Sequence, residues 1–88
     1  MLHLQENHVH GIMKALFDDS YPNITHFVKV LGWIEIGHDE DSPVASFIRA
    51  INLGGIVWEG EDQYKSLDEA FQDLERGLRE WMLKEAID

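Results

Sequence analysis

The sequence predicts an α+β domain, in which a three-stranded antiparallel sheet is followed by an amphipathic C-terminal helix (βββα), with one or two helices at the N-terminus. Three observations favour this fold class. A capped apolar stripe of helical period fills the last part of the chain. A glycine pair between two apolar runs is typical of a hairpin, and a short run of Trp and Ile precedes it. Because 88 residues supply one core only, we expect a single domain over residues 1–88.

The first 31 residues contain two sets of apolar residues at helical spacing. The first set predicts a helical extension, ordered or mobile, within residues 1–22, and consists of Val9, Ile12, Met13, Leu16 and Phe17. The second set predicts a short helix over residues 23–31, and consists of Ile24, Phe27, Val28 and Leu31. Asn23 can cap this helix and Gly32 can end it. A strand over residues 27–30 is the alternative prediction.

The predicted core occupies residues 33–82 and opens with a strand over Trp33–Ile36. A polar loop joins it to a hairpin, whose turn we place at Gly54 and Gly55 because glycine supplies the positive φ that a two-residue turn requires. This turn would oppose Leu53 to Ile56 and thereby define two faces of the sheet. The expected core face consists of Phe47, Arg49, Ile51, Leu53, Ile56 and Trp58. The expected second face consists of Ile48, Ala50, Asn52, Val57 and Glu59.

The C-terminal helix is predicted to begin at a capping box, because the Ser66 hydroxyl can accept the Glu69 amide while the Glu69 side chain reaches back. Its apolar stripe consists of Leu67, Ala70, Phe71, Leu74, Leu78, Trp81 and Met82. Gly77 interrupts the stripe, and we expect another backbone to come close there. Aromatic residues are expected to complete the core; they are Trp33, Trp58, Trp81, Phe47 and Phe71.

Charge and composition exclude several classes of function. Seven Lys and Arg against 17 Asp and Glu give a formal net charge of −10, which repels a nucleic-acid backbone or an anionic membrane. The lack of cysteine excludes disulfides and thiol chemistry. No apolar run approaches the ~20 residues of a membrane span, and the N-terminus does not have the pattern of a signal peptide. We therefore expect a cytoplasmic protein that binds neither nucleic acid nor membranes directly.

Residues 33–82 resemble the core of HicB-like antitoxin domains. The segments that carry the resemblance are GWIEIGHDEDS, VASFIRAI, GIVWEGED and SLDEAFQDLERGLREWM. The resemblance implies a strand–strand–strand–helix order and a precedent for binding another protein. HicB-like chains usually continue into a DNA-binding segment, whereas only residues 83–88 follow here, so the resemblance does not extend to operator binding. The stretches GWIEIG and VWEGED are also similar to short uncharacterised proteins, found mainly in cyanobacteria.

No motif for catalysis or metal binding stands out. The N-terminal histidines are five and two residues apart, whereas a metal-binding pair on a helix needs a spacing of three or four. The serines lack a nucleophile elbow or a triad motif. Two acidic loops form a weaker candidate for a cation site, without the residue order of a calcium loop. The residues of this candidate are His38, Asp39, Glu40, Asp41, Glu61 and Asp62. We predict no catalytic residue, no cofactor and no metal ligand.

The second face of the sheet is the strongest functional indication. A single helix covers one face only, so a semi-apolar second face needs the N-terminal helices, a second copy or a partner to shield it. The candidate interface residues are Ile48, Ala50, Val57 and Glu59. We predict a non-enzymatic protein-interaction module that forms a homodimer or binds another protein, for which a basic partner suits the charge. The alternatives are a HicB-like antitoxin-type inhibitor of a small basic toxin, and a metal-binding protein or enzyme that uses the acidic loops.

Overall fold

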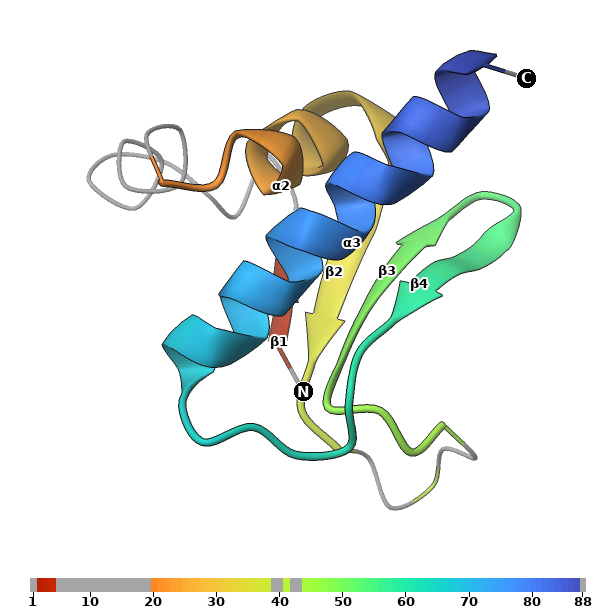
Figure 1. The fold of residues 1–88 in the computed structure, drawn as a ribbon. Coiled ribbons are helices and arrows are strands. Elements are labelled where there is room, and N and C mark those ends of the chain that lie inside the picture. The colour runs from red at the N-terminus through yellow and green to blue at the C-terminus, as the bar shows by residue number, and fades with distance from the viewer. Residues whose placement is uncertain (1, 5–19, 39–40, 42–43, 88) are drawn as a thin grey trace.

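The computed structural model describes residues 2–4, 20–38, 41 and 44–87, which form a four-stranded antiparallel sheet with one long helix across one face (Figure 1). The strands follow the order β1 (Leu2–Leu4), β2 (Trp33–Ile36), β3 (Ile48–Asn52) and β4 (Gly55–Glu59). Two short helical segments, α2 (Pro22–His26) and η2 (Phe27–Leu31), precede β2, and α3 (Leu67–Ile87) ends the domain. The predicted fold class, with its sheet followed by a C-terminal helix and an N-terminal helix, is confirmed.

Strand β1 is an addition that the sequence analysis did not predict. It pairs with β2 in antiparallel register, so that His3 lies opposite Glu35. Three residues are too short a run to show the alternation that identifies a strand in a sequence. The helix predicted from Val9 to Phe17 lies outside the described residues.

The short helix predicted over residues 23–31 is present as α2 and η2, in which the last five residues have π-helical geometry. Pro22 occupies its first turn, where the missing amide proton costs nothing. The amide of Gly32 donates to the Phe27 carbonyl at 2.9 Å and closes the last turn. A β-carbon at Gly32 would lie 2.0 Å from the Ile51 carbonyl oxygen, so only glycine lets the chain leave the helix so close to the sheet.

The first turn of α2 is capped from another element. The Glu75 carboxylate of α3 accepts the backbone amides of Asn23, at 2.9 and 3.1 Å, and of Ile24, at 3.0 Å. Asn23, the predicted cap, instead donates its side-chain amide to the same carboxylate. An anionic acceptor at a helix N-terminus satisfies free amides and complements the helix dipole. This cap therefore fastens α2 to α3 across 52 residues of sequence.

The hairpin turn lies one residue earlier than predicted. Asn52 pairs with Gly55, so Leu53 and Gly54 form the turn, and the Asn52 side chain accepts the Gly54 amide at 2.8 Å. Gly55 begins β4 with a φ of 121°, which favours glycine. An irregularity after Ala50 then pairs Ala50 with Trp58 and Ile51 with Ile56. The predicted pairs of Leu53 with Ile56 and of Ile51 with Trp58 are wrong.

The assignment of the core face of β3 is wrong, because the structure buries the opposite set of residues. Ile48 and Ala50 have no exposed surface and belong to the core cluster, whereas Arg49 and Ile51 point to the opposite face. Side chains alternate along a strand, so the two residue sets are the same for either turn, and the packing of α3 selects the buried one. The bulge adds one residue to β4, and Trp58 therefore lies opposite Ala50 on the core side of the sheet. The buried members of the core are Ile24, Phe27, Val28, Ile34, Ile36, Ile48, Ala50, Ala70, Leu74 and Leu78.

Helix α3 begins and packs largely as predicted. The Glu69 amide donates to the Ser66 hydroxyl at 3.1 Å, which confirms the cap. Gly77 is buried, but its close neighbour is a side chain and not a backbone. A β-carbon there would lie 2.1 Å from Nε1 of Trp58. The Trp58 indole thus packs on α3 at Gly77, the position of this helix that has no side chain.

Replacing Gly77 with alanine should destabilise the domain, although alanine is the better helix former. The helical gain is about 1 kcal/mol, whereas displacing a packed indole costs about 1–3 kcal/mol. We expect a net loss in the free energy of unfolding, measured by urea denaturation. Arg79→Ala, at an exposed position of the same helix, should change it by less than about 0.5 kcal/mol. A more stable Gly77→Ala protein would contradict the packing described here.

Removing the Glu75 cap should also be costly. Glu75→Ala leaves two backbone amides without their acceptor, and we expect a loss of about 2 kcal/mol in the free energy of unfolding. Glu75→Gln keeps one acceptor oxygen, so its free energy of unfolding should lie between those of the wild type and of Glu75→Ala. Glu80→Ala is the matched control, because that carboxylate is exposed and pairs with Arg76 of the same helix, at 3.1 Å; it should cost less than about 0.5 kcal/mol. Equal losses for Glu75→Ala and Glu80→Ala would argue against a structural cap.

Candidate functional site

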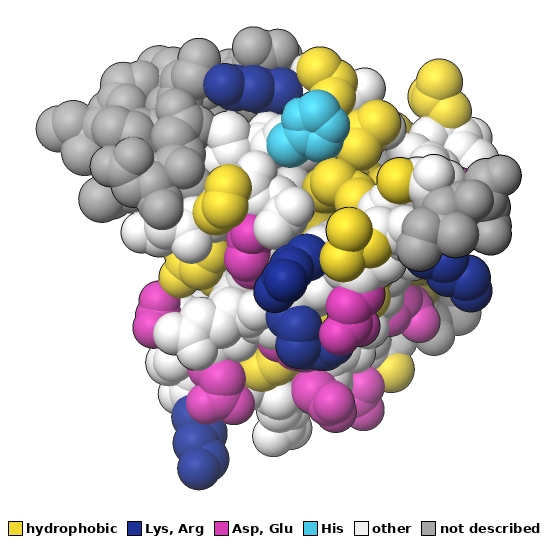
Figure 2. Space-filling view, turned by 45° about the horizontal axis from the view of Figure 1, so that its top comes forward, with side chains coloured by type: hydrophobic (Ala, Val, Ile, Leu, Met, Phe, Trp, Pro, Cys, Tyr) yellow, Lys and Arg dark blue, Asp and Glu magenta, His cyan; other side chains and the backbone are white. Residues whose placement is uncertain are grey.

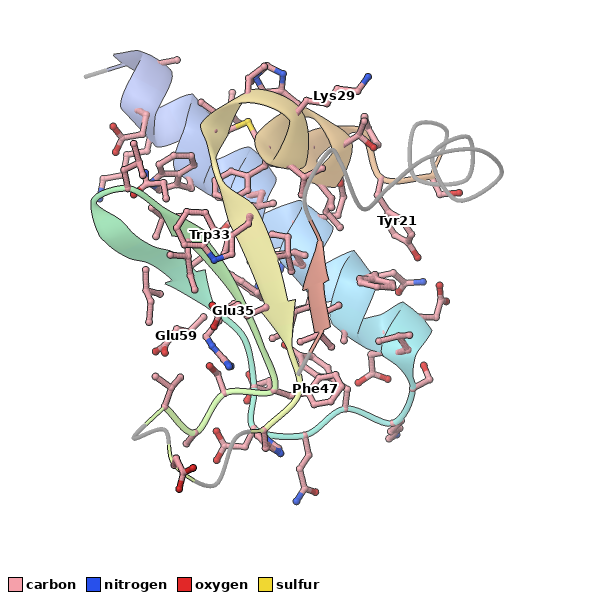
Figure 3. The ribbon with its side chains drawn as sticks, turned by 180° about the vertical axis from the view of Figure 1, so that it is seen from behind. Tyr21, Lys29, Trp33, Glu35, Phe47 and Glu59 are labelled. Carbon is pink, nitrogen blue, oxygen red and sulfur yellow. The ribbon has the colours of Figure 1, made fainter. Side chains whose placement is uncertain are left out.

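The face of the sheet opposite α3 carries two rows of side chains, and we call it the open face. Its members are Trp33, Glu35, Arg49, Ile51, Ile56 and Glu59. The strand register aligns Trp33, Ile51 and Ile56 in an apolar row, and a charged row runs beside it. Trp33, Glu35 and Glu59 lie on the viewer's side of the sheet in Figure 3, with α3 behind it. Among the described residues, no helix packs over this face.

The charged row is centred on Arg49, which is only 2% exposed. Its Nε donates to Glu35 at 3.2 Å, and one terminal nitrogen donates to the Ser46 carbonyl at 2.7 Å. Burial of a guanidinium without an anion and hydrogen bonds would be strongly unfavourable. Trp33 Nε1 donates to the second Glu35 oxygen at 3.3 Å, and the Ser46 hydroxyl donates to Glu59 at 3.4 Å. The network therefore ties the segment before β3 to the sheet.

The apolar row is partly exposed. Trp33 and Ile51 are half-buried, Ile56 is 47% exposed, and Leu53 at the hairpin tip is fully exposed. Trp33 was expected in the core, but the alternation in β2 buries Ile34 and Ile36 and turns Trp33 to the open face. Apolar side chains that gather at one place on a surface are typical of interaction sites.

The predicted interface residues separate into two groups. Ile48 and Ala50 lie beneath α3 with no exposed surface, so the prediction of an interface on them is wrong. Val57 is half-buried next to the bulge, and Glu59 is exposed on the open face. The residues that the prediction missed are Trp33, Ile51 and Ile56. Alternation in Trp33–Ile36, where two isoleucines alternate with a tryptophan and a glutamate, is the signal that could have located the outward face of β2.

A second group of exposed apolar side chains lies on the helical side of the molecule. Hydrophobic side chains gather around η2 and the C-terminal end of α3 in Figure 2. The exposed fractions are 66% for Val30, 39% for Leu31 and 55% for Leu83. Leu83 belongs to α3, which lies on the other side of the sheet from the open face, and it supplies a comparison position for mutagenesis.

The acidic-loop residues come together only in part. Asp39 and Glu40 lie outside the described residues, and Asp41 is exposed. His38 and Asp62 line one depression of about 360 Å³, which we call the aromatic pocket; its other lining residues are Phe47, Gln63, Tyr64, Ser66 and Leu67. Glu61 lines a neighbouring depression beside Asp73 and Arg76. Within the described ranges, no three His, Asp or Glu side chains gather as a metal ion would require.

Backbone hydrogen bonds of Phe47 hold the aromatic pocket together. Its amide donates to the Glu61 carbonyl and its carbonyl accepts the Gly37 amide, at 2.9 and 2.6 Å. Its ring lies edge-on to His38, with centroids 5.8 Å apart, and to Tyr64, at 6.2 Å. Three segments distant in sequence thus share one wall of rings.

Tyr64 is fixed by polar contacts on the outer side of this wall. Its hydroxyl donates to Asp73 at 2.6 Å and accepts the Glu61 amide at 2.8 Å. Burial and the neighbouring Asp73 carboxylate disfavour the phenolate and raise the pKa of Tyr64 from 10.0 to about 12. The hydroxyl therefore stays protonated throughout the neutral range.

The raised pKa of Tyr64 predicts a loss of stability in alkali. The unfolded chain releases this proton near pH 10.0 and the folded protein near 12, so the stabilisation is complete below pH 10 and is lost as the pH rises through 12. Tyr64→Phe should lower the free energy of unfolding at pH 7 by about 1 kcal/mol and make its decline above pH 10 shallower. Urea denaturation at a series of pH values from 7 upwards measures both. An unchanged alkaline slope in Tyr64→Phe would count against this assignment.

Comparison with known proteins adds no identification. No protein-family model matches the sequence, and no curated protein or solved structure matches it either. The resemblance to HicB-like domains stays a prediction. In the part of the chain that the structure describes, no helix has both the length and the apolar character to cross a membrane.

Proposed function

We propose that this chain is a non-enzymatic protein-interaction module that binds a basic protein partner through its open face. The observation that carries the proposal is the partly exposed apolar row of Trp33, Ile51 and Ile56, on a side of the sheet that no described helix covers. Leu53, at the tip of the hairpin that β3 and β4 form, is fully exposed. Apolar area of this kind is stabilised when a partner removes it from water.

The charged row favours a basic partner over a second copy. Glu35 and Glu59 flank Arg49 in the register, so the row carries a formal charge of −1. Two copies would each carry a formal net charge of −10 over the whole chain and repel one another, whereas a basic partner would be attracted. A partner with an apolar strip beside Lys or Arg therefore suits both rows.

The contacts of the charged row support binding more than catalysis. Arg49 donates to Glu35 and to the Ser46 carbonyl, and Trp33 donates to Glu35. These groups hold each other and the chain before β3 in place, which suits a preformed surface. A rigid surface loses little conformational entropy when it binds.

The HicB-like resemblance gives a narrower form of the same proposal, in which the partner is a small basic toxin. The support is the strand–strand–strand–helix order of residues 33–82, which the resemblance implies. In this form the partner would be a ribonuclease and its activity would fall on binding.

Ile56→Asp tests the open face, and Leu83→Asp is the matched control on the other side of the domain. Both side chains are about half exposed, at 47% and 55%, so both variants should fold, which circular dichroism checks. Tagged proteins are used for native pull-down from the source organism, with mass spectrometry and light scattering on the eluate. We expect a stoichiometric basic protein with wild type and Leu83→Asp, and at least a tenfold lower yield with Ile56→Asp, because the new carboxylate would be buried at the interface.

Three other outcomes would contradict the proposal. A clean eluate of self-associated protein would assign the open face to a homo-oligomer. Equal capture by wild type and Ile56→Asp would remove the open face from the interaction. Loss of the partner with Leu83→Asp alone would move the interface to the group around η2 and the end of α3.

A further inference from the structure

The aromatic pocket has the features of a binding site that is separate from the open face. Its walls come from His38 after β2, from Phe47, and from the connection between β4 and α3 with the first residue of α3. The two hydrogen bonds of the Phe47 backbone join these segments. The site is therefore formed before any ligand arrives. A volume of about 360 Å³ is near the lower end of ligand pockets, which suits one side chain better than a large cofactor.

The pocket presents apolar surface at the edge of the core, against which Phe47 and Tyr64 are partly buried. Phe47 and Tyr64 contribute rings, and Leu67, in the first turn of α3, is 50% exposed. Leu67 was predicted to belong to the apolar stripe of α3, but it lies outside the buried cluster. Rings that are fixed by neighbouring contacts, such as Tyr64 by Asp73 and Glu61, make a preorganised platform for stacking.

The electrostatic surroundings are strongly negative. Residues 59–75 contain seven Asp and Glu and one lysine, Lys65. Asp62 lies on the pocket wall itself. The positive end of the α3 dipole opposes this field, but Asp68 and Glu69 occupy the first turn and offset it. The Ser66 hydroxyl also satisfies one of the free amides there. A cation is thus favoured over an anion.

We propose that the aromatic pocket binds the guanidinium of an arginine side chain from a peptide or protein. A guanidinium is flat and weakly hydrated, so it stacks on aromatic rings, and its N–H groups match a carboxylate such as Asp62. Lysine would gain the charge attraction and lose the planar stacking. The lining residues of the pocket do not overlap with the members of the open face.

The first test compares N-acetyl-arginine amide with N-acetyl-citrulline amide, which has nearly the same shape without the charge. Each compound is titrated into ¹⁵N-labelled protein at low salt and followed by NMR. We expect saturable shifts centred on Gly37, Phe47 and residues 61–67, and at least threefold weaker binding of the citrulline compound. Binding should also weaken at 0.5 M NaCl, because the Debye length falls to about 4 Å. Equal binding of both compounds, or shifts that spread over the acidic surface without saturation, would overturn the proposal.

Variants locate the site. Asp62→Asn should weaken arginine binding about threefold, whereas Glu85→Gln, an exposed change of the same charge near the end of α3, should leave it unchanged. Phe47→Leu keeps apolar volume and removes the central ring, and it should reduce binding below detection if it folds by circular dichroism. If Phe47→Leu does not fold, Leu67→Ala takes its place with an expected weakening of about twofold or more.

Equal effects of Asp62→Asn and Glu85→Gln would mean non-specific attraction to the net charge, which also overturns the proposal. The open-face variant Ile56→Asp should bind arginine like the wild type, so failure of one proposal is distinguishable from failure of the other.

Discussion

The packing of α3 on one face of the sheet is the constraint on which the rest of the structure depends. Ala70, Leu74 and Leu78 are fully buried against a sheet face that presents Ile34, Ile48 and Ala50. Burial of such side chains contributes most of the favourable free energy in a domain of this size. The even-numbered core residues of β2 and β3 all face this helix. Because side chains alternate along a strand, the odd-numbered residues must face the other way. The open face is therefore a consequence of the core.

Contacts along α3 place the remaining elements. Near its middle, Gly77 admits the Trp58 indole and fixes β4 against the helix. Glu75 caps α2 and holds the segment before β2 on the same helix. Near its beginning, Asp73 anchors Tyr64, which forms part of the wall of the aromatic pocket. One helix thus positions the sheet, the helical entry and the pocket, through contacts whose sequence separation ranges from nine residues for Tyr64 and Asp73 to 52 for Asn23 and Glu75.

The two proposed sites use different consequences of this arrangement. The open face combines an apolar row with a charged row whose arginine is buried and hydrogen-bonded, so it offers a preformed surface to a large partner. The aromatic pocket lies where three connections meet at one end of the sheet, and it offers stacking rings in a negative field to a single side chain. Both sites suit basic ligands, because none of the Asp and Glu side chains among the described residues is buried.

Sequence by itself determined the class of fold, the order of the elements in residues 33–82, the start of α3 at Ser66 and the acidic character of the surface. These features are local, since helical period, capping and turn residues act over a few neighbouring positions. It did not determine which face of β3 is buried, because both faces carry apolar side chains. Either turn leaves Ile48 with Ala50 on one face, and the packing of α3 decides which face is covered. Strand β1, the Glu75 cap and the meeting of His38, Phe47 and Tyr64 were likewise decided only by tertiary structure. Each depends on contacts between distant segments, and their energies appear only once the chain has closed on itself.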